Sequence, residues 1–195
     1  IWTAPEAAAT IEVEDIFQVE NAFIIAKIAG ELSVINQHRA HAQVLYERYQ
    51  LNQLIASQQL LFPRTIELSK ADYALYLDIQ DQINALGFDT SEFGKNAIII
   101  NGLPSELSKA DGANVVMQIL DDFKTNYQDL KINKTDAIRQ ATAKNAAIKA
   151  GKTLSMIEMN SLLSDLFHCK QHTTDSAGKS IIIKLSKSSL ERFFH

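Results

Sequence analysis

The stretch that most constrains the fold of this 195-residue sequence is IFQVENAFIIAKIAGELSVIN, residues 16–36. It contains two apolar segments separated by Ala-Gly-Glu, and Gly30 supplies the conformational freedom that a tight turn needs. Residues 16–28 and 32–35 are therefore predicted to pair as a β-hairpin. This hairpin places a sheet at the start of the fold, which excludes an all-helical architecture.

The remaining segments alternate between helical and extended patterns. The patterns predict helices over 37–58, 71–88, 109–128, 134–150 and 153–167, strands over 64–68, 96–104 and 180–186, and a short C-terminal helix. We expect an α+β fold, with a mixed or antiparallel sheet packed against helices and a smaller inserted α/β lobe. The expected divisions are the end of a linker over 1–14, an inserted outer lobe over 70–131, and a main subdomain from 15–69 plus 132–195.

Composition narrows the class of protein. A net charge of −4 is unlike that of a strongly basic, non-specific DNA-binding domain, so only weak contact with DNA is expected. One cysteine excludes an internal disulfide and suits a reducing compartment. No apolar run reaches the length of a membrane span, and no signal-peptide pattern is found, so we expect a cytoplasmic protein without membrane contact.

A histidine-rich stretch near the C-terminus, HCKQH, offers His168, Cys169 and His172 as metal ligands. Structural zinc sites need four ligands, in pairs of characteristic spacing, and no second pair follows this one. The sequence therefore predicts no zinc site here and assigns these three residues no role.

Five segments, in order, resemble the C-terminal domain of the DNA mismatch repair protein MutL. They are FQVENAFIIAKIAGELSVINQHRAHAQVLYERY (17–49), QQLLFP (58–63), LGFDTSEFGKNAIIINGLP (86–104), AIKAGKTLSMIEMNSLLSDLF (147–167) and GKSIIIKLSKSSLERFF (178–194). The resemblance covers about residues 16–194 and implies a homodimerisation domain of a bacterial mismatch repair ATPase. In many members this domain is also a metal-dependent endonuclease that nicks DNA.

The endonuclease ligands of the family are mostly replaced in this sequence. The positions of the degenerate endonuclease motif in this sequence are Asn36, His38, Ala42, Glu47, Ala143, Asp175 and Ala177. The three alanines have no ligand atom, and Asn36 fits the N-cap of the helix that follows it. His38 and Glu47 are nine residues apart, on opposite faces of one helix, so they are not expected to chelate one ion. The resemblance therefore implies a former active site, with no catalytic and no metal-binding residues.

The segment QQLLFP resembles the family motif that binds the replication sliding clamp, with Gln58, Leu61 and Pro63 at the matching positions. A glutamine and apolar anchors on an extended segment suit docking into a groove of a partner. The alternative is that Leu60, Leu61 and Phe62 belong to the core and lead into the next strand.

Dimerisation needs an apolar surface beyond what one chain buries. The hairpin strands and the helix LSMIEMNSLLSDLF are candidates, the latter with Leu154, Ile157, Leu162, Leu163 and Phe167. The alternative is that all five line the core of the protomer, and only the resemblance favours the interface.

These observations predict a homodimerisation domain without enzymatic activity, which joins two ATPase arms. The resemblance implies MutS and other repair proteins as further partners, and ATP and Mg²⁺ as cofactors of a missing N-terminal half. One alternative is a divergent metal-dependent endonuclease that uses Asp175, His172 and His38. Another is a monomeric docking module that works through QQLLFP.

Overall fold

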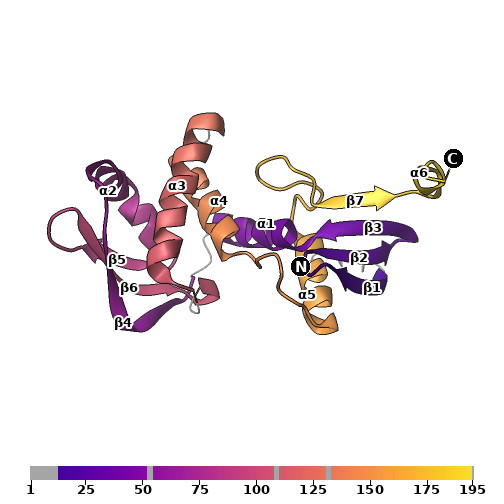
Figure 1. Ribbon diagram of the computed structural model, residues 1–195, viewed down its shortest axis with the longest axis horizontal. Coiled ribbons are helices and arrows are strands. Elements are labelled where there is room, and N and C mark those ends of the chain that lie inside the picture. The colour runs from indigo at the N-terminus through magenta and orange to yellow at the C-terminus, as the bar shows by residue number, and fades with distance from the viewer. Residues whose placement is uncertain (1–12, 52–54, 108–109, 131–132, 195) are drawn as a thin grey trace, which may run out of the picture. The chain divides into compact units, whose positions relative to one another are not determined.

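The computed structural model describes residues 13–51, 55–107, 110–130 and 133–194, and its fold is α+β, as expected. The chain forms two compact units, shown in Figure 1. The residues up to Val44 and from Ala147 onward form one, here called the terminal unit, and Leu45–Ala146 form the other, here called the central unit.

These boundaries differ from the expected ranges, 15–69 plus 132–195 and 70–131. Strand β4 (Ser57–Glu67) belongs to the central unit because it pairs with β6 (Ala97–Pro104). Helix α4 (Lys134–Ala146) belongs there because its alanines and Ile138 are buried in the same core. The expected linker over 1–14 lies almost wholly outside the described residues, and β1 begins at Val13.

The terminal unit contains a four-stranded antiparallel sheet in the order β1-β2-β3-β7. Its strands are β1 (Val13–Val19), β2 (Phe23–Ile28), β3 (Glu31–Asn36) and β7 (Ile182–Leu185). The segment expected as one arm of a hairpin, 16–28, is two strands, because Glu20 and Asn21 take positive φ angles and reverse the chain. The expected turn at Gly30 is confirmed, since Ala29 and Gly30, both with positive φ, link the paired residues Ile28 and Glu31.

One face of this sheet is covered by helix α5 (Met156–His168), as Figure 1 shows. Ser155 begins α5 with a capping box. The Ser155 hydroxyl accepts from the Glu158 amide, and the Glu158 carboxylate accepts from the Ser155 amide. The buried partners of the sheet on α5 are Met159, Leu162, Leu163 and Leu166. Burial of each such side chain stabilises the unit by roughly 1.5–3 kcal/mol.

The central unit contains a second antiparallel sheet, in the order β4-β6-β5, with β5 at Asp89–Glu92. Helices α2 (Lys70–Ala85), α3 (Gly112–Leu130) and α4 pack with it around a core that includes Ile98 and Ile100 of the middle strand. The sequence did not predict β5, because DTSE has no apolar alternation. Gly87 ends α2 as expected, with φ of +88° and its amide bonded to the Asn84 carbonyl.

Helices α1 (Gln37–Gln50) and α4 end before the residues at which they were expected to end. Helix α1 was predicted to reach residue 58, but Ser57 already belongs to β4. Helix α4 ends at Ala146 rather than 150, before Ile148, whose backbone is held by histidine side chains. The short terminal helix is α6 (Lys187–Glu191). Among the described residues, no helix combines the length and apolar character needed to cross a membrane.

Candidate functional site

The start of α1 is held by side chains whose sequence pattern suggested metal ligands. Asn36 is an N-cap, because its side-chain oxygen accepts from the Arg39 amide at 3.0 Å. The Nδ1 atom of His38 lies 2.9 Å from the carbonyl oxygen of Ile148, and Nδ1 of His41 lies 3.0 Å from the Ile148 amide. A carbonyl only accepts and an amide only donates, so His38 is protonated at Nδ1 and His41 at Nε2. These histidines therefore anchor one backbone residue from both sides.

The loop that carries Asp175 uses this carboxylate for its own structure. One oxygen of Asp175 accepts from the amides of Ala177 and Lys179, at 3.0 and 2.8 Å. The other lies 3.9 Å from Nε of Arg39, whose guanidinium also donates to the Ser180 carbonyl. The Asp175 oxygens are thus engaged by backbone amides and a cation.

The remaining former ligand positions contribute little. The side chains of Ala42 and Ala177 have no atom that could ligate a metal, and Ala143 is buried in the core of the central unit. Glu47 belongs to the central unit, whereas His38 belongs to the terminal unit. In the described parts of the chain, no three His, Cys, Asp or Glu residues are grouped so that they could hold a metal ion.

The HCKQH stretch is arranged around the end of α5. Nδ1 of His168 lies 2.6 Å from the Ser164 carbonyl, and the Cys169 thiol donates to the Asp165 carbonyl at 3.5 Å. The ring of His172 packs edge-on against Phe167, with centroids 5.5 Å apart. These contacts give each side chain a structural neighbour on α5.

Five residues in α5 and just before it were candidates for the dimer interface, and most of them contribute to the core of the protomer. Leu154, Leu162 and Leu163 are buried in the core of the terminal unit, and Phe167 packs against that core. Only Ile157 projects into solvent, with 81% of its surface exposed. The sequence had left this alternative open.

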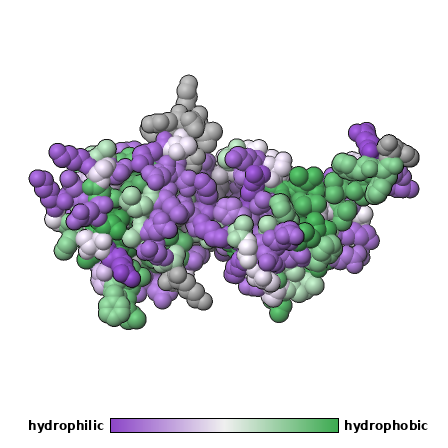
Figure 2. All heavy atoms as spheres, in the orientation of Figure 1, coloured by the Kyte–Doolittle hydropathy of each residue, from purple (hydrophilic) through white to green (hydrophobic). Residues whose placement is uncertain are grey.

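The open face of the four-stranded sheet carries the apolar surface instead. The register aligns Phe17, Ile25, Val34 and Ile183 in one row across all four strands, on the face opposite α5. Phe23 and Leu32, also exposed, flank this row. Figure 2 shows hydrophobic residues gathered over this part of the molecule. We call Phe17, Phe23, Ile25, Leu32, Val34 and Ile183 the open sheet face.

The sequence did not single out the open sheet face, since the apolar runs FIIAKI and ELSVI place hydrophobic residues on both sides of their strands. An apolar run without strict alternation is itself a signal that both faces of a sheet are covered. Among the described residues, only one face of this sheet is covered.

The segment Leu60–Pro63 leaves the sheet of the central unit. Gln59 pairs with Gly102 and Arg64 pairs with Ile100, so four residues of β4 oppose Asn101 alone. Leu61 and Phe62 are 93% and 80% exposed. Leu61 and Phe62 are therefore not core residues, whereas Leu60, the third residue of the alternative drawn from the sequence, packs against the core of the central unit. We call Leu60–Pro63 the β4 bulge.

Gly102 keeps the strands close beside this bulge. A Cβ atom there would lie 2.8 Å from the Ser57 hydroxyl and 3.1 Å from the amide nitrogen of Gln59. That nitrogen donates instead to Asp89 at 2.9 Å. Gln59 is thus fixed toward β5, whereas Leu61 and Phe62 point to solvent.

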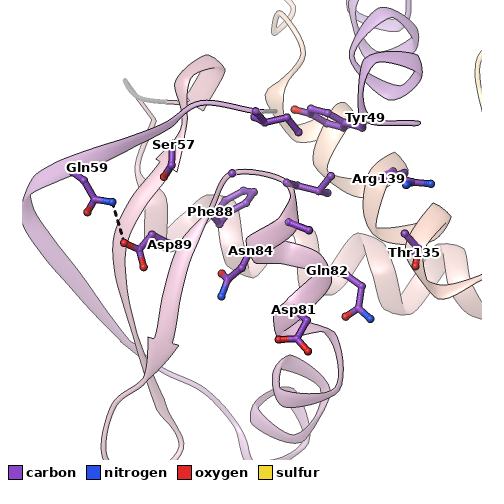
Figure 3. Close-up of a pocket in the computed structure, with 14 residues that line it drawn as sticks. Tyr49, Ser57, Gln59, Asp81, Gln82, Asn84, Phe88, Asp89, Thr135 and Arg139 are labelled. Carbon is purple, nitrogen blue, oxygen red and sulfur yellow. Dashed lines mark hydrogen bonds between the residues drawn. The ribbon is translucent and has the colours of Figure 1, made fainter. Parts of the chain in front are cut away.

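A pocket of about 750 Å³ lies elsewhere in the central unit. Tyr49, Ile55, Leu86 and Phe88 supply much of its apolar wall, and Figure 3 shows polar side chains from α2, α4 and the strands around it. Nothing in the sequence pattern predicted it, because its residues are scattered over the central unit.

Among the described residues, an apolar sheet face stays uncovered, which is typical of a domain that associates with another chain. Comparison with known proteins agrees, because the model of the MutL C-terminal dimerisation domain matches residues 16–154. The chain belongs to this family. Its curated relatives are DNA mismatch repair MutL proteins from Chlorobium phaeobacteroides, 36% identical over 92% of this chain, and Parabacteroides distasonis, 34% identical over 97%. The chain spans about 30% of the length of these relatives.

Proposed function

We propose that the open sheet face is the surface through which two copies of this domain form a homodimer. A sheet packs in a domain by burying an apolar face, and here four strands present one that no element of the terminal unit covers. A second copy would bury the row of Phe17, Ile25, Val34 and Ile183 against its own row, as expected for a self-complementary two-fold interface.

Sedimentation equilibrium over a wide concentration range tests this assignment. Ile183→Glu buries a charge in the proposed interface, and we expect it to convert a two-chain mass into a one-chain mass at micromolar concentration. Ile157→Glu is the matched control, because Ile157 is exposed on α5, away from the open sheet face. A dimer lost in the Ile157 variant and kept in the Ile183 variant would move the interface to α5.

We propose that, in the longer protein, this dimer joins two N-terminal ATPase arms in mismatch repair. The support is the family, together with relatives about three times as long as this chain. ATP and Mg²⁺ would then bind outside this domain, MutS and other repair proteins would act with it, and DNA contact through this domain would be weak. We expect this work to take place in the cytoplasm, and the support is that the relatives are bacterial DNA mismatch repair proteins.

The β4 bulge is the second proposed contact, with the replication sliding clamp as partner. Its support is the exposure of Leu61 and Phe62 on an edge strand. Gln58 and Pro63, the other two motif residues, are also exposed on this strand. We expect Leu61→Ala with Phe62→Ala to reduce binding to a purified bacterial sliding clamp at least tenfold, in a fluorescence anisotropy assay, without changing the dimer mass. The control is Leu77→Ala, which removes a half-exposed leucine from α2. Unchanged clamp binding in the double variant would refute this contact.

We also infer that this domain does not nick DNA by itself. The support is the loss of ligand atoms at Ala42, Ala143 and Ala177, and the use of Asp175 by backbone amides. Incubation of supercoiled plasmid with the chain and Mn²⁺ should give nicked product only at the level of the buffer. Nicking that His38→Ala abolishes would instead support the divergent endonuclease, as would stoichiometric zinc or manganese binding in calorimetry.

A further inference from the structure

The pocket of the central unit contains a tyrosine hydroxyl without a hydrogen-bond partner. Tyr49 lines the pocket, only 1% of its surface is exposed, and its hydroxyl makes no hydrogen bond to any residue that the structure describes. Burial raises the pKa of the Tyr49 hydroxyl well above its usual value, so the group remains a proton donor. A buried hydroxyl without a partner costs stability, which is unusual unless a ligand supplies that partner.

A second buried tyrosine in the same core shows the ordinary arrangement. The hydroxyl of Tyr76, which does not line the pocket, bonds to Oγ1 of Thr90 at 2.9 Å. Thr90 in turn donates to Asn84 at 2.7 Å. The core therefore satisfies one tyrosine and leaves the other, at the pocket, unsatisfied.

An acceptor without a partner among the described residues also lines this pocket, beside Asp81 in Figure 3. The side-chain carbonyl oxygen of Gln82 is buried and makes no hydrogen bond. The pocket thus offers one donor, from Tyr49, and one acceptor, from Gln82. A peptide backbone presents the complementary groups, carbonyls that accept and N–H groups that donate.

The shape and charge of the pocket limit the class of ligand that it could bind. Ile55, Leu86 and Phe88 provide apolar surface for an apolar side chain. Asp81 and Asp89 lie at the polar side, and Arg139, the cation of the pocket wall, is 3.5 Å from Asp136. In the view of Figure 3, Tyr49 and Asp81 lie at opposite ends of the group. This charge balance favours a neutral or cationic ligand over a phosphate or carboxylate.

We propose that this pocket binds a peptide segment of a protein partner, with an apolar side chain against Phe88, a backbone carbonyl that accepts from Tyr49, and a basic side chain facing Asp81. This contact is separate from both the open sheet face and the β4 bulge.

The test is a titration of the ¹⁵N-labelled 195-residue chain with the dipeptide acetyl-Leu-Lys-NH₂, followed by NMR. We expect saturable shifts of the amide resonances of Gln82, Leu86 and Phe88, and weaker binding of acetyl-Leu-Glu-NH₂. Tyr49→Phe should weaken binding about fivefold, the loss of one hydrogen bond. Ala85→Phe, which fills the mouth of the pocket from an exposed position, should abolish binding.

Thermal unfolding of the variants gives an independent readout. Tyr49→Phe should keep or raise the melting temperature, because it removes an unsatisfied hydroxyl. Tyr76→Phe, the matched control, should lower the melting temperature and leave the peptide affinity unchanged, because its hydroxyl is bonded within the core.

Three results would overturn the proposal. The first is the absence of shifts with acetyl-Leu-Lys-NH₂, and the second is binding of adenosine in its place, which would make this a nucleoside pocket. The third is an equal loss of melting temperature in Tyr49→Phe and Tyr76→Phe, which would show that the Tyr49 hydroxyl has a partner in the free protein.

Discussion

The two sheets of this protein leave apolar side chains uncovered in different ways. In the terminal unit, a whole face of four strands is open, with α5 on the other side. In the central unit, the sheet buries its middle strand, and the two most exposed large apolar residues, Leu61 and Phe62, lie in the β4 bulge at one edge. A broad face suits a large permanent interface, whereas a short extruded segment suits insertion into a groove of a partner.

The difference between the buried and the open face of the terminal sheet is tested most directly by mutation of two adjacent residues of β2. Ile24 is fully buried under α5, whereas Ile25 lies on the open sheet face. Ile24→Ala should lower the free energy of unfolding by about 2–5 kcal/mol, because it leaves a cavity in the core. Ile25→Ala should mainly weaken the dimer.

Chemical denaturation at several protein concentrations separates the two effects. The midpoint of the Ile25 variant should depend more strongly on concentration than that of the original chain, since dimerisation stabilises the folded state by mass action. If Ile25→Ala lost as much stability as Ile24→Ala at every concentration, both faces would belong to the core of one protomer.

A smaller effect is expected at the anchored residue of the terminal unit. His41→Phe leaves the Ile148 amide without its acceptor and should destabilise the chain by about 1–3 kcal/mol. Hydrogen exchange of the Ile148 amide, measured by NMR, should become faster. An unchanged exchange rate would show that another group holds this amide.

A still smaller effect is expected in the central unit at Asp72, beside the N-cap Ser69 of α2. Hydrogen bonds from Lys124 and then from Ser69 hold the pKa of Asp72 below its usual 3.8. Folding therefore favours the charged carboxylate, so this stability is complete above the unfolded pKa and is lost as pH falls through the folded pKa. Asp72→Asn should cost less than about 0.5 kcal/mol at neutral pH, because solvent screens the pair.

Denaturation at a series of pH values checks the sign of this effect. The difference between the Asp72 variant and the original chain should shrink as pH is lowered toward about 3. A difference that grows under acid would mean that folding favours the protonated form of Asp72, which is a shift of its pKa in the opposite direction.

The smallest expected effect concerns the β4 bulge. Leu61→Ser should change the free energy of unfolding by less than about 0.5 kcal/mol, because the side chain is almost fully exposed. Differential scanning calorimetry measures this directly. A loss above 2 kcal/mol would show that Leu61 is buried within the folded chain and would remove it as a docking residue.

Local patterns predicted much of the fold. The turn at Gly30, the end of α2 at Gly87 and the N-cap at Asn36 follow from short-range rules and are present as expected. The length of α1 and the strand β5 were missed, since both depend on pairing with distant segments.

The candidate sites show the same limit. The sequence shows that Ala42 and Ala177 lack ligand atoms. Only the structure shows that the Asp175 carboxylate accepts a hydrogen bond from the Lys179 amide within its own loop. The sequence alone does not distinguish buried from exposed residues among the leucines of α5 and the isoleucines of β2. Contacts with distant segments decide which of them are buried.

By itself, the sequence determined the α+β class, the order of most elements and the resemblance to the dimerisation domain family. Capping, turn chemistry and hydrophobic periodicity act over a few residues, so they can be recognised without the fold. The tertiary structure decided which apolar face is open, that Leu60–Pro63 leave the sheet, and that Tyr49 has no partner. Burial and hydrogen-bond satisfaction depend on contacts between residues far apart in the chain, which no local pattern contains.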